Sequence, residues 1–191
     1  MIALPNYADI NGRPMKKLQI QQYLRKLQLN DFEPAVNLAT LTKLQDAHLK
    51  YIPYENFDSL NGKITSLKRQ DMFNKVIMHN RGGICFELNG LYNWLLESLG
   101  FEVTSYAARF IDKMETYQLR RHRVMCVALG EKRYLTDVGV NSESPRVPLE
   151  ITEGLIQSDG ISQYKFTRSE FWGWLLWQKE CGKIWKRLFG F

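Results

Sequence analysis

Cys85 stands where a cysteine can act as a nucleophile. It follows Gly82 and Gly83 in the segment RGGICFELNG and lies at the start of an apolar helical pattern over residues 88–99. The N-terminus of a helix offers unpaired N–H groups and the positive end of the helix dipole, and both favour the thiolate form of a cysteine. Glycines also allow a sharp backbone turn that leaves a neighbouring sulfur open to a substrate. This pattern predicts covalent catalysis through Cys85.

A reactive thiol needs a base and an acid that orients the base, and the sequence offers few candidates for the base. Of the three histidines, His122 begins the strand-like segment HRVMCVAL, and Asp137 ends the next such segment, RYLTD. If residues 122–129 and 132–137 pair as a hairpin, both side chains lie at the same end, where Asp137 can fix the tautomer of the His122 ring. A cysteine, a histidine and an aspartate occur in nearly every protein, so spacing alone leaves ordinary structural roles open.

The composition is that of a globular protein. The chain has 191 residues, of which 45% are hydrophobic and 24% charged, and its net charge is +6. No apolar run approaches the roughly 20 residues that span a bilayer, and the N-terminus lacks the pattern of a secretion signal. Three cysteines cannot form a disulfide framework. The basic residues match no nucleic-acid motif. We expect a reduced, cytoplasmic protein with no membrane or nucleic-acid partner.

The elements that must position these residues change type near residue 100. Apolar stripes predict helices over the first half, with one helix starting at Pro34 and another ending at Gly100. The segments that follow are rich in β-branched and aromatic residues and predict strands, with GEKR as a turn between two of them. These predicted strands cover residues 101–110, 122–129, 132–140, 164–170 and 171–179. Helices followed by strands predict an α+β fold.

Four segments carry a resemblance to a known family. They are IPYENFDSLNGK at 52–63, RGGICFELNGLYNWLLESLGF at 81–101, HRVMCV at 122–127 and TDVGV at 136–140. In this order they resemble the arylamine N-acetyltransferases, over nearly the whole chain from about Ile20, and the RGG-x-C block is highly specific. The resemblance implies a helical bundle at 1–100 carrying the nucleophile, a β-barrel at 101–191 carrying histidine and aspartate, and a core like that of cysteine proteases.

The same resemblance implies an activity and its residues. Cys85, His122 and Asp137 would be catalytic, with acetyl-CoA as co-substrate and no metal. An acetyl group would pass to a small-molecule amine, an arylamine or hydrazine, by a ping-pong mechanism through an acyl-thioester on Cys85.

The acceptor pocket implied by the resemblance comprises Tyr54, Phe110 and Val140. Val140 replaces the aromatic residue usual in the family, so we expect a wider or differently selective pocket. Family members usually continue beyond the segment that WKRLFGF resembles, into a third portion. For a chain that stops at Phe191 we therefore expect a homodimer that buries an apolar patch, or weaker binding of CoA.

Other functions with the same residues stay open. One is a related cysteine amide synthase with a different acyl donor, and another is a hydrolase in which water replaces the amine. A third is an inactive, truncated member of the family that serves as an interaction module. The sequence does not identify the natural amine or the preferred acyl donor.

Several further residues invite a chemical role but favour a structural one. We interpret Cys126 as a packed thiol, Arg81 and Glu87 as anchors of the loop and helix, and Asn89 as a side chain that bonds backbone near the site. The tryptophans near the end of the chain are expected in the core: Trp172, Trp174, Trp177 and Trp185.

Overall fold

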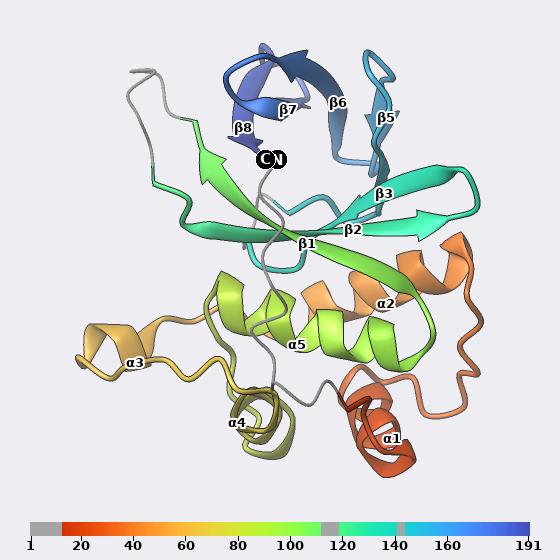
Figure 1. Cartoon of the computed structure of the whole chain (residues 1–191), viewed down its shortest axis with the longest axis vertical. Helices are drawn as coiled ribbons and strands as arrows, with labels where there is room; N and C mark the ends of the chain where they lie inside the picture. The colour runs from red at the N-terminus through yellow and green to blue at the C-terminus, as the bar shows by residue number, and fades with distance from the viewer. Residues whose placement is uncertain (1–12, 112–118, 141–143) are drawn as a thin grey trace.

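Helices precede strands, as predicted. The structure is a computed structural model that describes residues 13–111, 119–140 and 144–191 (Figure 1). The helical segments are α1 (Lys17–Lys26), α2 (Leu38–Tyr51), α3 (Phe57–Leu60), α4 (Arg69–Phe73), the π-helical turn η1 (Asn74–Met78) and α5 (Cys85–Ser98). The strands are β1 (Glu102–Phe110), β2 (His122–Leu129), β3 (Lys132–Thr136), β4 (Leu149–Glu150), β5 (Gln157–Ser158), β6 (Ser162–Ser169), β7 (Gly173–Glu180) and β8 (Lys186–Gly190). This order confirms the α+β prediction.

The helix ends follow local hydrogen bonding. α2 begins at Leu38 and not at Pro34, because the side chain of Asn37 accepts a hydrogen bond from the Thr40 N–H at 2.8 Å and caps the helix there. Gly100 adopts φ +92° just beyond α5, in the left-handed region that favours glycine, so the predicted end of that helix is confirmed.

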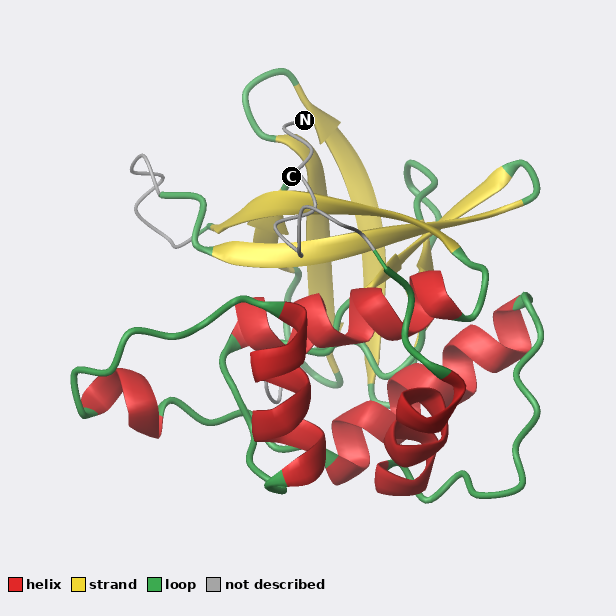
Figure 2. Ribbon diagram, turned by 60° about the horizontal axis from the view of Figure 1, so that its bottom comes forward, coloured by secondary structure: helices red, strands yellow, loops and turns green. Residues whose placement is uncertain are grey.

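The strands form one antiparallel sheet that curls into a nearly closed barrel (Figures 1 and 2). Their order is β4-β3-β2-β1-β8-β7-β6-β5. The two edge strands meet through a side chain: Glu150 N–H donates to the Gln157 Oε1 at 2.7 Å, and Gln157 Nε2 donates to the Glu150 carbonyl at 2.9 Å. Gly130, at φ +61°, and Glu131 form the tight turn between β2 and β3, which confirms the turn predicted at GEKR.

Two hydrophobic cores lie on opposite faces of β2. Met125 and Val127 pack with the helices, whereas Val124 packs inside the curled sheet. This alternation follows from the two-residue period of a strand. Figure 2 shows the helices as a layer beneath the sheet. The first core contains residues of both helices and strands, so the predicted division into two domains, 1–100 and 101–191, stays a proposal. The predicted helical bundle and the cysteine-protease-like core of Cys85, His122 and Asp137 also stay proposals.

Within the described residues, no helix combines the length and the apolar character needed to cross a bilayer.

Candidate active site

Cys85 is the first residue of α5, as the sequence predicts. Its side chain is partly exposed, and its Sγ lies 3.7 Å from the carbonyl oxygen of Arg121, the residue that precedes β2. The thiol is therefore held between the start of a helix and the start of a strand, and it remains accessible.

The two glycines before Cys85 lie where the backbone of residues 53–55 comes close to them. The Glu55 N–H donates to the Gly83 carbonyl at 3.1 Å, and Tyr54 forms a parallel bridge with Gly83. A Cβ on Gly82 would lie 2.0 Å from the Pro53 carbonyl oxygen. Neither glycine has a positive φ. Gly82 is thus needed for packing against residues 53–55, whereas a Cβ on Gly83 would lie 2.9 Å from the Glu87 carboxylate. The glycines serve these close contacts, and not the sharp turn expected from the sequence.

A charged cluster holds this loop and the helix start together. Lys75 Nζ lies 2.8 Å from Glu87 and 2.9 Å from Asp58, while Arg81 lies 2.7 Å from Glu55. The other carboxylate oxygen of Glu87 accepts the Ile84 N–H at 2.9 Å, which satisfies a backbone donor at the beginning of α5. These contacts support the structural roles predicted for Arg81 and Glu87.

His122 and Asp137 form a buried pair. His122 Nε2 lies 2.7 Å from Asp137 Oδ2, and both side chains are fully buried. β2 and β3 pair in the predicted hairpin, so the first residue of one strand meets the residue just after the other. Asp137 Oδ1 also accepts hydrogen bonds from Asn89 Nδ2 and from the Gly139 N–H, each at 2.8 Å. The carboxylate is therefore fixed from three sides.

This environment favours the protonated form of His122. Burial lowers the pKa of its ring, but the charge and hydrogen bond of Asp137 raise it more, and Cys85 adds to the increase, so that the pKa rises to about 9. Because Nε2 bonds Asp137, the other ring nitrogen, Nδ1, is the one available for proton exchange with Cys85. The arrangement suits an imidazolium beside a thiolate.

Asn89 and Gly139 connect Cys85 to Asp137. Asn89 lies one helical turn after Cys85, and its Oδ1 accepts the Val138 N–H at 2.9 Å. A Cβ on Gly139 would lie 2.8 Å from the Cys85 Cα. The sequence indicated that Asn89 bonds backbone, but its contact with Asp137 and the requirement for glycine at 139 were missed. No local pattern in the sequence indicates either contact.

The residues expected in the acceptor pocket lie in different settings. The Phe110 ring lies 5.0 Å from the His122 ring, and burial together with the nearby Cys85 raises the pKa of Tyr54. Val140 packs against the core inside the sheet. Phe189 of β8, which was not among the predicted pocket residues, lies 5.4 Å from the His122 ring. The structure thus brings both Phe110 and Phe189 close to the His122 ring.

The other two cysteines differ from Cys85. Cys126 is buried, and burial raises the pKa of its thiol to about 11 despite the opposing charge of Arg133, so it is a neutral thiol near pH 7. Cys181 is exposed on the surface after β7. The packed role predicted for Cys126 fits this environment.

Comparisons of sequence place the chain among acyl-transfer proteins. The model of the N-acetyltransferase family matches residues 37–191. An arylamine N-acetyltransferase of Mycolicibacterium smegmatis is 35% identical over 152 residues, which are 76% of this chain and 55% of that protein. The proansamycin X synthase of Amycolatopsis mediterranei is 30% identical over 183 residues, 93% of this chain and 68% of that protein. The chain spans about half the length of the arylamine N-acetyltransferases it matches.

Solved structures agree with these relatives. The arylamine N-acetyltransferase of Salmonella typhimurium superposes with a TM-score of 0.84 at 26% identity, over 92% of this chain and 63% of that one. The enzyme of Mycobacterium marinum in complex with CoA superposes with a TM-score of 0.81 at 27% identity, over 90% and 64%. From the family match, the relatives and the shared fold, we conclude that the chain belongs to the arylamine N-acetyltransferase family.

Proposed function

We propose that this chain transfers an acetyl group from acetyl-CoA to an arylamine or hydrazine, with Cys85 as nucleophile, His122 as base and Asp137 as orienting acid. The observation that carries the proposal is the buried His122–Asp137 pair, 2.7 Å apart, beside the accessible thiol at the start of α5. The names of the relatives and the CoA complex of a structural neighbour support the choice of donor and acceptor. In this proposal residues 1–100 supply the nucleophile, and residues 101–191 supply the base and acid.

The first half-reaction loads the enzyme. His122 Nδ1 takes the proton of the Cys85 thiol, and the resulting thiolate attacks the thioester carbonyl carbon. The N–H groups of Cys85 and Phe86 begin the helix and have no intrahelical acceptor, so they are placed to stabilise the developing oxyanion. The carbon–sulfur bond to CoA breaks, His122 returns the proton to the departing thiolate, and Cys85 keeps the acetyl group.

The second half-reaction unloads it. The nitrogen of the incoming amine attacks the carbonyl carbon of the Cys85 thioester while His122 removes a proton from that nitrogen. His122 then gives the proton to the departing Cys85 sulfur. The product is an amide, which is more stable than the thioester consumed. Asp137 keeps the His122 ring oriented and stabilises its charge throughout.

Amide synthesis with another acyl donor is the second candidate. The proansamycin X synthase aligns over more of this chain than the M. smegmatis acetyltransferase does, 93% against 76%. The step on Cys85 would be the same, and only the acyl group and the amine would differ. A hydrolase and an inactive module remain as outcomes of the test below.

Mass spectrometry of the intact chain tests the proposal. After mixing with acetyl-CoA, the wild-type protein should gain one acetyl group, located on Cys85 by peptide mapping. Cys85→Ala should gain none, while Cys126→Ala, which removes the buried thiol, should be acetylated like the wild type. Adding an arylamine should discharge the acetyl group and form the N-acetyl product.

Each other outcome has a definite meaning. No acetylation by acetyl-CoA but acylation by a different thioester would favour the amide synthase. Discharge at the same rate with and without amine would indicate a hydrolase. A protein that accepts no acyl group from any donor would be inactive and would refute the proposal. The cytoplasmic location and the homodimer stay predictions.

A further inference from the structure

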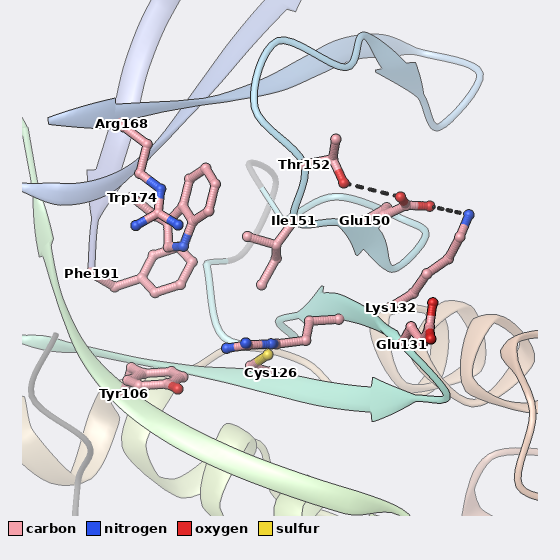
Figure 3. Close-up of a pocket in the computed structure, with 11 residues that line it drawn as sticks. Tyr106, Cys126, Glu131, Lys132, Glu150, Ile151, Thr152, Arg168, Trp174 and Phe191 are labelled. Atoms are coloured by element: carbon pink, nitrogen blue, oxygen red, sulfur yellow. Dashed lines mark hydrogen bonds and ion pairs between the residues drawn. The ribbon is translucent and has the colours of Figure 1, made fainter.

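A cavity opens inside the curled sheet, away from the triad. It has a volume of about 300 Å³ and is lined by residues of β1 to β4 on one side and of β6 to the end of the chain on the other. Figure 3 shows Tyr106 and Cys126 along one wall, with Arg168, Trp174 and Phe191 grouped beside them. Cys85, His122 and Asp137 do not line it. We call this space the barrel cavity.

Packed side chains separate the barrel cavity from His122. Cys126 is four residues beyond His122 on β2, which corresponds to roughly 13 Å along a strand. Between them, the fully buried Val124 faces the interior of the sheet. Phe189 lies 5.4 Å from the His122 ring and 6.3 Å from the Phe191 ring, so it stands between the base and the cavity wall. A ligand in the barrel cavity would therefore not touch the triad.

Two arginines of the barrel cavity carry positive charge without a carboxylate partner. The guanidinium of Arg168 lies 3.9 Å over the Trp174 ring. Arg133 pairs opposite Ala128 in the β2–β3 register, on the face that also carries Cys126, and its charge acts on Cys126 and Tyr106. Among the described residues, neither guanidinium forms an ion pair with Asp or Glu within 4 Å.

The carboxylates around the barrel cavity are mostly engaged elsewhere. Glu150 lies 2.8 Å from Lys132 Nζ and accepts a hydrogen bond from the Thr152 hydroxyl at 3.0 Å. Glu153, next to the cavity, accepts the backbone N–H of Arg168 at 3.0 Å. Glu131 lies in the turn at the rim. The two guanidinium groups are thus left to bind an external anion.

We propose that the barrel cavity binds a small aromatic carboxylate. A guanidinium offers paired N–H donors that match a carboxylate, and Arg168 and Arg133 supply two of them. The rings of Trp174, Phe191 and Tyr106 form an apolar wall suited to a planar ring. A volume of about 300 Å³ is at the small end of ligand pockets, which fits a single aromatic ring and excludes a ligand as large as CoA.

Calorimetric titration with benzoate tests this proposal, with benzylamine as a ligand of similar shape and opposite charge. Benzoate should bind and benzylamine should not. Arg168→Gln and Arg133→Gln should each weaken benzoate binding about 10-fold, the effect expected for losing hydrogen bonds to a charged group. Arg25→Gln, which changes an exposed arginine of α1 in the helical layer, should leave it unchanged.

A second arm separates the barrel cavity from the triad. In a Cys181→Ser background, which removes the exposed thiol, iodoacetamide should alkylate Cys85 and leave the buried Cys126 free. The alkylated protein should bind benzoate as before. Absence of benzoate binding, equal binding of benzylamine, wild-type affinity in both arginine variants, or loss of binding on alkylation of Cys85 would each overturn the proposal.

Discussion

Asp137 is the residue on which the candidate triad depends most. Its Oδ2 meets His122 at 2.7 Å, while its Oδ1 accepts hydrogen bonds from Asn89 and from the Gly139 N–H. The charge of this carboxylate is also the main reason why the buried His122 has a pKa of about 9 and not below 6.5. Orientation and charge therefore come from one side chain, and they can be separated by substitution.

Asp137→Asn should retain the shape and lose the charge. The amide oxygen can still accept hydrogen bonds from Asn89 and Gly139, so the fold should persist, but only the smaller effect of Cys85 would then oppose the lowering of the His122 pKa by burial. In a serine triad the equivalent change costs about 10⁴ in kcat, and we expect a loss of at least about 10² here. The measurements are kcat with an arylamine and the rate of Cys85 alkylation against pH.

The control for this variant is Asp58→Asn, which removes a carboxylate that contacts Lys75 and Arg81 outside the triad. It should leave the pH profile of alkylation unchanged. An identical profile in Asp137→Asn and wild type would remove Asp137 from the mechanism.

At the scale of single residues, the sequence predicted the three members of the candidate triad but not the contacts that hold them in place. Cys85, His122 and Asp137 are chemically distinctive, and the motif around Cys85 is specific. Phe189 was not predicted because its contact with His122 depends on β8 pairing with β1, a neighbour more than sixty residues earlier in the chain. Such long-range pairings leave no local pattern in the sequence.

At the scale of elements, the site is made where three backbone segments meet. The loop at residues 53–55 packs on Gly82 and Gly83, and the loop after β3 packs on the first residue of α5. The third strand predicted from the sequence runs through Val140, but β3 ends at Thr136. The apolar residues after Asp137 suggested a strand, yet the Val138 N–H bonds the Asn89 side chain and the Gly139 N–H bonds Asp137. Side-chain hydrogen bonds replaced the ladder there.

Gly139→Ala should separate these elements. The new Cβ would meet the Cys85 Cα at 2.8 Å and the Asn89 Nδ2 at 2.8 Å, and the first of these is a backbone atom that cannot rotate away. We expect a loss of about 2 kcal/mol in the free energy of unfolding, typical of overpacking, together with a large loss of acetyl transfer. Urea denaturation and initial rates measure the two effects.

Gly160→Ala provides the matched control. Gly160 has φ +88° and open space around it, so alanine there introduces backbone strain of about 1 kcal/mol without a clash. That variant should lose stability and keep its activity per folded molecule. If Gly139→Ala behaved in the same way, the contact between the β3 loop and α5 would have no role in positioning the nucleophile.

At the scale of the whole molecule, the sheet separates the helix-packed core from the interior of the barrel. Its helix-facing side shares one core with α1, α2 and α5, and its inner side encloses aromatic residues and the barrel cavity. The sequence predicted the order of helices and strands, because periodicity is local. It did not predict the cavity: Trp174 was expected in the core, but it is only partly buried and lines that space. Which apolar residues border a void depends on how far the sheet curls.

The buried His122–Asp137 pair also affects the stability of the whole protein. The pKa of His122 is about 9 in the folded chain, against 6.5 for an unperturbed histidine, so the folded state binds the proton more tightly. A base with a raised folded pKa contributes stability that is complete below pH 6.5 and is lost as the pH rises through about 9. The difference corresponds to about 3 kcal/mol.

We therefore expect the free energy of unfolding to fall between pH 6.5 and 9, and to fall less in Asp137→Asn. Urea denaturation at several pH values measures this, and the difference between the two proteins is the informative quantity. Other titrating groups do not change this difference. The buried His48, with a pKa of about 3, reduces stability only below pH 6.5, and Cys126, with a pKa of about 11, acts equally in both proteins.

The control for this prediction is Cys85→Ala. It keeps Asp137, the main source of the raised His122 pKa, and should retain most of the fall in the free energy of unfolding between pH 6.5 and 9. Parallel curves for wild type and Asp137→Asn would mean that His122 is neutral in the folded protein, and that the thiol is activated without an imidazolium beside it.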